Sequence, residues 1–171
     1  MTQPDSTAIR PLTTRDLDAF IELRLEALND SPFAFGSSPE DDKVLQKKHM
    51  REVLENVNEQ VVFGCFEGNR LVGITGLFRE EHLKMRHRAG IWGVYVTPEY
   101  RRKGVATAMM HQAIALAREW GLEQLDLGVS VSTDDAKRVY EAIGFRVWGR
   151  QPRAVKWNRF VVDEEYMSLQ L

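Results

Sequence analysis

The segment 89–120 constrains the fold of this chain more than any other part of the sequence. Residues 89–96 are apolar at almost every position, which is typical of a strand buried on both faces, and Pro98 ends that strand. Residues 103–120 then place apolar side chains at helical spacing, and Gly121 follows as a helix stop. A buried strand that runs through a short turn into a long helix indicates a sheet covered by helices.

The rest of the sequence predicts a single α+β domain over residues 9–171, preceded by a flexible polar tail at residues 1–8. Runs of apolar and β-branched residues predict further strands at 9–12, 60–66, 70–78, 125–131, 145–151 and 164–171. The resulting order is β-α-α-β-β-β-α-β-α-β-β. This order predicts a twisted, mixed sheet of six or seven strands flanked by about four helices.

Three further helices are expected from capping residues and helical spacing. Thr13 or Thr14 caps the first, whose apolar residues then recur at helical spacing. Ser38, followed by a proline and acidic residues, opens the second, which runs to about residue 56. Thr133 caps the last, and the two aspartates in its first turn suit the positive end of the helix dipole.

The composition is that of an ordinary globular protein and argues against several functional classes. Hydrophobic residues make up 43% and charged residues 28%, and the net charge of −2 predicts no basic face for nucleic acid or an anionic membrane. One cysteine and four histidines without ligand spacing predict no disulfide and no metal site. No apolar run approaches the roughly 20 residues that span a bilayer, and the first ten residues lack the apolar core of a secretion signal. We therefore predict a cytoplasmic protein without nucleic-acid or membrane partners.

The turn at residues 101–106, RRKGVA, carries the chemistry that the sequence predicts. It lies between the buried strand and the long helix, so free backbone N–H groups would point to one spot at the positive end of the helix dipole. Gly104 and Ala106 keep side-chain bulk away, which would let a diphosphate approach the backbone. Taken alone, a basic turn with one glycine also fits a plain, solvated connection between a strand and a helix.

The spacing within this turn is more specific than its charge. Arg101, Gly104 and Ala106 match the pattern R/Q-x-x-G-x-G/A, and residues 94–100, VYVTPEY, have the character of the strand and lead-in that precede it. In these features the chain resembles the GNAT superfamily of N-acyltransferases, whose loop of this pattern binds the pyrophosphate of coenzyme A.

A second signature of the same family lies one strand further along the chain. Ala136, Tyr140, Gly144 and Phe145 resemble its motif A-x-x-x-Y-x-x-x-G-F, and residues 163–169 resemble its closing strand. The resemblance covers about residues 8–171 and includes the order of the elements. It implies a GNAT-like fold and an acetyl-CoA-dependent N-acetyltransferase.

The resemblance also implies a reaction and a set of site residues. Acetyl-CoA would be the acetyl-donor cosubstrate, and a primary amine of a small molecule or peptide would attack it directly in a ternary complex, without a metal. The strands at 91–96 and 124–130 would part, and the amide of Val94 would polarise the thioester carbonyl. Tyr140 would be the catalytic residue, protonating the leaving thiolate. Acetyl-CoA binding is implied for Val94, Tyr95, Val96, Arg101, Arg102, Lys103, Gly104, Val105, Ala106, Thr107 and Ala136.

Two positions depart from the family pattern. Thr133 stands where many relatives have asparagine, and it is read here as a helix cap without a substrate role. Gly90 stands where many relatives have an acidic general base. The base is therefore unassigned: a water, another side chain, or none if the amine arrives neutral. This gap keeps a rival open, a non-catalytic acyl-CoA-binding or regulatory domain on the same fold.

Other readings stay open at the level of single residues. Arg24 lies on the apolar face of the first helix, either as a paired or snorkelling arginine or as a residue that binds the acceptor. Phe33 and Phe35 either anchor a loop or form a wall of the acceptor site. The sequence does not identify the acceptor amine. Exposed edge strands would also allow the chain to form a homodimer.

Overall fold

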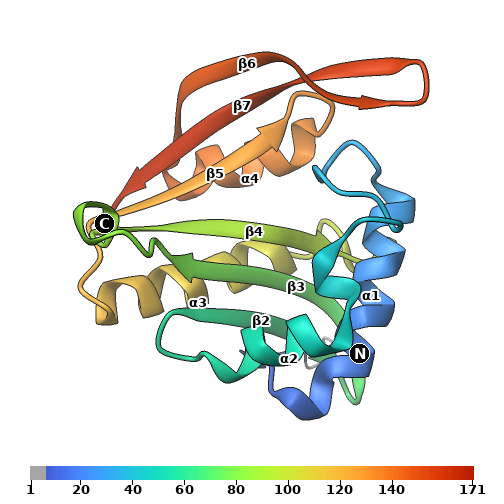
Figure 1. Ribbon diagram of the computed structural model, residues 1–171, viewed down its shortest axis with the longest axis vertical. Coiled ribbons are helices and arrows are strands. Elements are labelled where there is room, and N and C mark those ends of the chain that lie inside the picture. The colour runs from blue at the N-terminus through green and yellow to red at the C-terminus, as the bar shows by residue number, and fades with distance from the viewer. Residues whose placement is uncertain (1–6) are drawn as a thin grey trace, which may run out of the picture.

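The fold is a seven-stranded mixed sheet with helices on both faces, as seen in a computed structural model that describes residues 7–171 (Figure 1). The strand order is β1-β2-β3-β4-β5-β7-β6, and the predicted α+β class and element order are confirmed. Residues 1–6 of the predicted tail lie outside the described residues, and β1 begins at Thr7. The strands are β1 (Thr7–Pro11), β2 (Gln60–Glu67), β3 (Arg70–Arg79), β4 (Arg88–Val96), β5 (Gln124–Ser130), β6 (Arg146–Trp157) and β7 (Phe160–Gln170).

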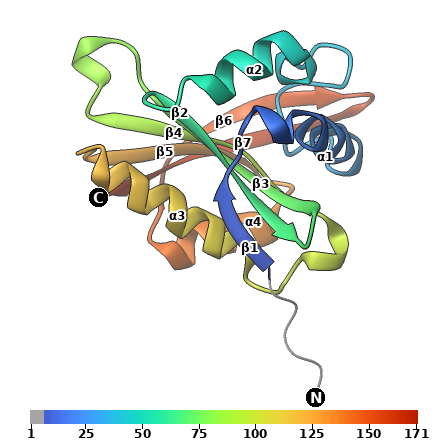
Figure 2. The ribbon, with the colours of Figure 1, turned by 90° about the horizontal axis from the view of Figure 1, so that it is seen from below.

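Within residues 7–171, four α-helices cover the sheet: α1 (Leu17–Asp30), α2 (Lys47–Glu55), α3 (Val105–Glu119) and α4 (Asp134–Ile143). Helices α1 and α2 lie on one face and α3 and α4 on the other, as the second view shows (Figure 2). Each face has its own buried apolar cluster, so the central strands are covered on both sides. None of the helices formed by residues 7–171 is long and apolar enough to cross a membrane.

The chain enters α1 through a capping box, as the threonines there predict. The Thr13 side chain accepts a hydrogen bond from the backbone at the start of a short 3-10 turn, and the Asp16 carboxylate accepts one from the Thr13 N–H at 2.8 Å. Arg10 of β1 donates two hydrogen bonds to the same carboxylate, each 2.8 Å long. Asp16 therefore ties the first strand to the first helix.

The second helix begins later than Ser38, so that prediction is wrong. The Ser38 N–H donates to the Asp41 side chain at 2.7 Å in a tight turn, and Asp42 is extended, with φ −71° and ψ 113°. This extended residue turns its carboxylate inward to the buried Arg24 of α1. The ion pair goes with an extended, non-helical backbone at Asp42. The helix α2 therefore begins only at Lys47.

The parting of β4 and β5 creates the space for a site. The two parallel strands are paired only from Arg88 opposite Gln124 to Gly90 opposite Asp126, and then diverge (Figure 1). Gly93 has a φ of +64°, and the register with β3 shifts beside it, which marks a β-bulge in β4. β5 stays paired with β7 along its whole length. The sheet therefore opens between two well-paired halves.

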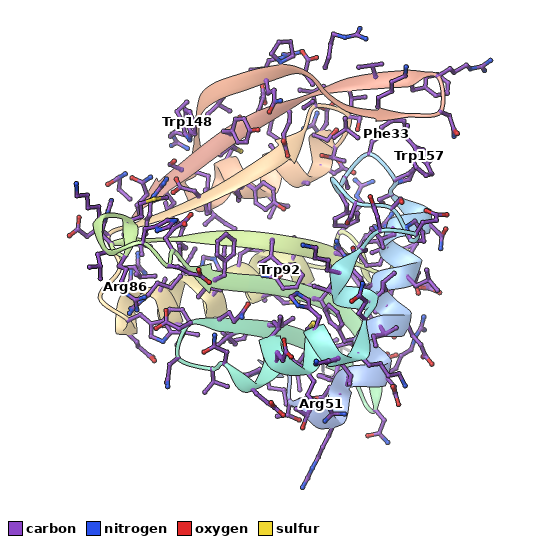
Figure 3. All side chains as sticks on the ribbon, in the orientation of Figure 1. Phe33, Arg51, Arg86, Trp92, Trp148 and Trp157 are labelled. Atoms are coloured by element: carbon purple, nitrogen blue, oxygen red, sulfur yellow. The ribbon has the colours of Figure 1, made fainter. Side chains whose placement is uncertain are left out.

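The C-terminal hairpin is longer than the strands predicted at 145–151 and 164–171. β6 and β7 continue to a tight turn after Trp157, because their outer ends alternate weakly between apolar and polar residues and are stabilised mainly by pairing with each other. The Phe160 and Phe33 rings meet edge to face at 6.4 Å. Figure 3 labels Phe33 and, near the tip of the hairpin, Trp157. The hairpin thus reaches the segment that follows α1. The strands at the sheet edges are β1 and β6, and the homodimer stays a prediction.

Candidate functional site

A cleft of about 700 Å³ lies between the open edge of β4 and the first turns of α3 and α4. It brings together residues that are far apart in the sequence, from the end of α1 to the middle of α4. The sequence-predicted site residues that line it are Val94, Tyr95, Val96, Arg101, Arg102, Gly104, Val105, Ala106, Thr107, Ala136 and Tyr140. Lys103 is the exception: its Nζ lies 5.0 Å from the centre of the Tyr100 ring.

The loop before α3 has the backbone geometry of an anion site. Arg102 has a φ of +61° and Gly104 a φ of +79°, both left-handed, so the chain coils tightly before the helix. The N–H groups of the first helical turn, from Val105 to Thr107, have no acceptor within the helix and point into the cleft. A side chain at Gly104 would meet no atom within 4 Å, so the backbone there is open to a ligand. Together with the helix dipole, this arrangement favours a phosphate group.

Arg101 anchors the loop rather than adding a free charge to the cleft. Its Nε donates to the Val96 carbonyl at 2.9 Å, its Nη2 is paired with Asp30 at the end of α1, and its guanidinium lies 5.3 Å from the Tyr95 ring centre. The hydrogen bond from Arg101 lowers the pKa of the Asp30 carboxyl. The loop is therefore attached to both β4 and α1.

Tyr140 lies where the cleft meets a second, smaller cavity. Its side chain is buried on α4, with its ring packed edge to face against Phe145 at 6.1 Å. Burial raises the pKa of the Tyr140 phenol, which therefore stays protonated at neutral pH. Tyr140 also lines a cavity of about 70 Å³ between the parted strands, with Trp92 and Gly128 in its walls. A proton donor between two connected spaces suits a transfer from one bound molecule to another.

Thr133 is the N-cap residue of α4, as predicted, but its side chain makes no capping hydrogen bond. Its hydroxyl instead donates to the Ser130 carbonyl at 2.7 Å, which fixes the turn between β5 and α4. Thr133 lines both the cleft and the small cavity. The hydrogen bond therefore fixes the backbone at the point where the cleft and the small cavity adjoin.

Gly90 has no room for the acidic side chain that many relatives have there. A Cβ atom at this position would lie 2.3 Å from two ring atoms of Phe78, on the neighbouring strand. The expected position of a general base is therefore filled by an aromatic ring.

A carboxylate that the sequence reasoning missed lies on the other side of the gap. A Cβ atom at Gly128 of β5 would lie 2.5 Å from Oε1 of Glu164, so the Glu164 side chain covers this glycine. Gly128 is part of the wall of the small cavity. The available signal was Gly128 itself, because a glycine inside a strand often marks a close approach of another group.

Arg24 is buried beneath the α1 side of the same cavity. Asp42 accepts from its Nε at 2.8 Å and lies 2.7 Å from its Nη2, while the guanidinium carbon lies 4.5 Å from the centre of the Phe35 ring. Phe35 lines both the cleft and the small cavity. Arg24 is therefore a paired arginine, as one of the two readings of the sequence held, and it also lies directly behind the wall of the site.

The arrangement of strand, loop and helix agrees with a known family. Residues 21–145 match the acetyltransferase (GNAT) family. The chain belongs to this family. An uncharacterized N-acetyltransferase of Mycobacterium tuberculosis is 29% identical to this GNAT protein over 108 residues, 63% of this chain and 66% of the relative. The L-amino acid N-acetyltransferase AaaT of Escherichia coli is 28% identical over 105 residues, 61% of this chain and 64% of the relative.

Solved structures share the fold of this GNAT protein at low sequence identity. A GNAT acetyltransferase from Streptococcus pneumoniae superposes with a TM-score of 0.85 at 20% identity, covering 97% of this chain and all of that one. YncA, a putative acetyltransferase from Salmonella typhimurium solved with acetyl-CoA, has a TM-score of 0.84 at 21% identity, covering 96% and 94%. These likenesses establish the architecture.

The residues of this GNAT protein fit an acyl-CoA cosubstrate. Free amides and an open glycine at the start of α3 suit a diphosphate, and the unpaired edge of β4 offers backbone groups to an amide-containing arm. Membership of the family supports acetyl-CoA as the compound bound there. Among residues 7–171, no group of three or more His, Cys, Asp or Glu side chains is placed to hold a metal ion.

Proposed function

We propose that this GNAT protein is an acyltransferase that moves an acetyl group from acetyl-CoA to a primary amine in a ternary complex. The observation that carries the proposal is the pair of adjoining spaces at the β4–β5 gap, the cleft and the small cavity between the strands, with Tyr140 bordering both. A cleft with an anion site suits the donor, and the smaller cavity beyond it suits the reacting end of an acceptor.

The donor side is supported by backbone groups. The loop before α3 and the amides from Arg102 to Ala106 would hold the pyrophosphate, with the Thr107 hydroxyl beside them. The open edge of β4, at Val94 and Val96, would pair with the pantetheine arm. Acetyl-CoA supplies an acyl group activated as a thioester. An N–H donor at Val94 would polarise the acyl oxygen as negative charge develops on it.

The transfer step needs one proton moved on each side. The amine nitrogen forms a bond to the acyl carbon and loses its proton to water or to a side-chain base, and the carbon–sulfur bond breaks. The leaving sulfur takes a proton from the Tyr140 hydroxyl, which its raised pKa keeps protonated until that moment. Bulk solvent then restores the phenol.

The rival reading is a regulatory domain that binds acyl-CoA without turning it over. Such a domain needs the donor cleft but neither a buried phenol nor a second cavity between β4 and β5. Both features are found here, and they favour the enzyme.

The deciding experiment is a thiol-release assay with acetyl-CoA and a panel of amines. The panel covers polyamines, amino acids, aminoglycosides and peptides, and amino acids are included because of the name of the E. coli relative. Amine-dependent release of coenzyme A, with an acetylated product seen by mass spectrometry, would support the enzyme. Tight acetyl-CoA binding without turnover of any amine would support the regulatory domain.

A further inference from the structure

The small cavity is bordered by two glycines on facing strands. Gly93 of β4 and Gly128 of β5 both line it, and neither carries a side chain into the gap. A Cβ atom at Gly93 would lie 3.6 Å from Nη1 of Arg24, and one at Gly128 would lie 2.5 Å from Oε1 of Glu164. One side of the cavity is thus backed by a cation and the other by a carboxylate.

Arg24 has one unpaired nitrogen next to Gly93, which lines the cavity. The residue is only 6% exposed, and Asp42 together with the Ser37 hydroxyl engages its Nε and Nη2. Its Nη1 is buried and has no hydrogen-bond partner among the described residues. Because a buried N–H donor without an acceptor is costly, this nitrogen is suited to an oxygen that arrives with a ligand. The rigid pairing with Asp42 keeps that donor aimed at Gly93.

Glu164 differs from the acids on either side of it in β7. Asp163 is paired with Arg150 at 2.8 Å, and Glu165 is paired with Lys137 at 2.6 Å on the other face of the sheet. Glu164 makes no ion pair with any residue between 7 and 171. A half-buried carboxylate over the cavity wall attracts a cationic amine and can take its proton.

We propose that the acceptor of this enzyme is a free amino acid, bound with its carboxylate on Arg24 Nη1 and its amino group on the Glu164 side. This inference rests on the proposed acetyl transfer and names its substrate class. Glu164 accepts the proton that the ammonium loses, in place of the acid excluded from position 90. The amine then faces Val94 and Tyr140 across a cavity of about 70 Å³, which holds the reacting end of a small molecule.

The first test uses the unmodified protein. Each of several L-amino acids is compared with the amine that lacks its carboxylate and with its carboxamide. We expect kcat/KM for the amino acid to exceed that of the matched amine by roughly 10-fold or more, because the amine leaves Arg24 Nη1 unpaired. Equal or higher kcat/KM for the amine would overturn the inference, and equal kcat/KM for the carboxamide would assign the site to peptide N-termini. If no amine is acetylated at all, both the proposed acetyl transfer and this inference are wrong.

The second test separates the roles of the two side chains. Arg24→Lys keeps a cation beside Asp42 but removes the unpaired nitrogen. The ratio of kcat/KM for the amino acid to kcat/KM for the matched amine should therefore fall toward 1. Glu164→Gln should lower kcat/KM for amino acid and amine alike, and the loss should shrink as the pH rises and the free amine accumulates. A preference unchanged in Arg24→Lys, or a pH-independent loss in Glu164→Gln, would contradict the assigned roles.

The matched control is Glu165→Gln, on the same strand but the opposite face. It should keep both the substrate preference and the pH profile of the unmodified protein. Calorimetry with acetyl-CoA should give dissociation constants within about threefold for all three variants, because none of the residues lies in the donor cleft. Should Arg24→Lys fail to fold, the comparison of substrates on the unmodified protein still decides.

Discussion

At the residue scale, the surroundings of Tyr140 suit the role of proton donor that we propose for its phenol. Its helix places it inward, Phe145 holds the ring, and burial keeps the phenol protonated. No hydrogen bond from any residue between 7 and 171 holds its hydroxyl, which leaves the proton free for a bound molecule.

Replacing Tyr140 by phenylalanine should lower kcat by roughly 10- to 1,000-fold, the usual range for loss of a general acid. The ring and its contact with Phe145 remain, so acetyl-CoA affinity should change by less than about tenfold. Steady-state kinetics, calorimetry and a melting curve on the same preparation measure these quantities. A variant as fast as the unmodified protein across the pH range would make Tyr140 a packing residue.

At Gly90 a neighbouring side chain, Phe78, restricts which residue the position can accommodate. Gly90→Ala should destabilise the fold by about 1–3 kcal/mol, because the new methyl group would overlap the Phe78 ring. Chemical denaturation measures the free energy of unfolding. In the double variant with Phe78→Ala, the cost of the Gly90 change should largely disappear. Additive losses would show that Phe78 is not the obstacle.

Single residues were only partly predictable from the sequence. The motif predicted Tyr140 and the residues of the α3 loop, because their spacing along one loop and one helix fixes their relative positions. Glu164 was not predicted, and acceptor binding by Arg24 was only one of two readings, since the roles proposed for them depend on their contacts with Gly128 and Gly93. Such contacts leave no periodic trace in the sequence.

At the scale of elements, both ends of α3 carry a glycine with left-handed backbone and no atom within 4 Å of a would-be side chain. Gly104→Glu should weaken acetyl-CoA binding by roughly tenfold or more, because it places negative charge beside the anion site. Gly121→Glu, at the other end, carries the same backbone cost and serves as the control. If calorimetry gave equal acetyl-CoA affinities for the two variants, this loop would not be the phosphate-binding site.

The connection between β1 and α1 makes stability depend on pH. Hydrogen bonds from Arg10, together with that from the Thr13 backbone, lower the pKa of Asp16 from 3.8 to about 2. A lowered carboxyl pKa stabilises the fold above about pH 4, and this contribution is lost as the pH falls toward 2.

Asp16→Asn should therefore cost about 1–2 kcal/mol at neutral pH, a value reduced for the solvent exposure of Arg10, and this cost should vanish as the pH falls below the folded-state pKa of about 2. Asp18→Asn is the matched control, because its ion pair with Lys47 is mostly exposed. Denaturation curves at several pH values measure both variants. A constant difference between Asp16→Asn and the unmodified protein would contradict the linkage.

The elements themselves were largely predictable because their apolar periods are regular. The late start of α2 was not predictable. It goes with the extended backbone of Asp42, whose carboxylate pairs with Arg24 in another helix. The length of the β6–β7 hairpin was also missed. Its outer half is held by pairing between two strands rather than by an apolar face.

At the scale of the whole molecule, the sheet consists of two halves joined by a short stretch of β4–β5 pairing. Acetyl-CoA bound in the cleft would bridge them along the open edge of β4. Hydrogen exchange there and in the first turn of α3 should slow, by up to about 100-fold at a ligand concentration 100 times Kd. The outer edge of β6 should keep its rate. Unchanged exchange along β4 would show that the donor does not pair with this strand.

The Phe78 ring occupies the space that a side chain at position 90 would need, and this has a consequence for how the sequence evolved. The two positions share one volume, so an ancestor with an acid at 90 could not have carried this ring unshifted at 78. The same holds for Gly76, where a Cβ atom would lie 2.2 Å from the Trp92 ring. Each pair should therefore change together among related proteins. Lineages that exchanged the acid for glycine are expected to carry their proton acceptor on β7, as Glu164 is proposed to be here.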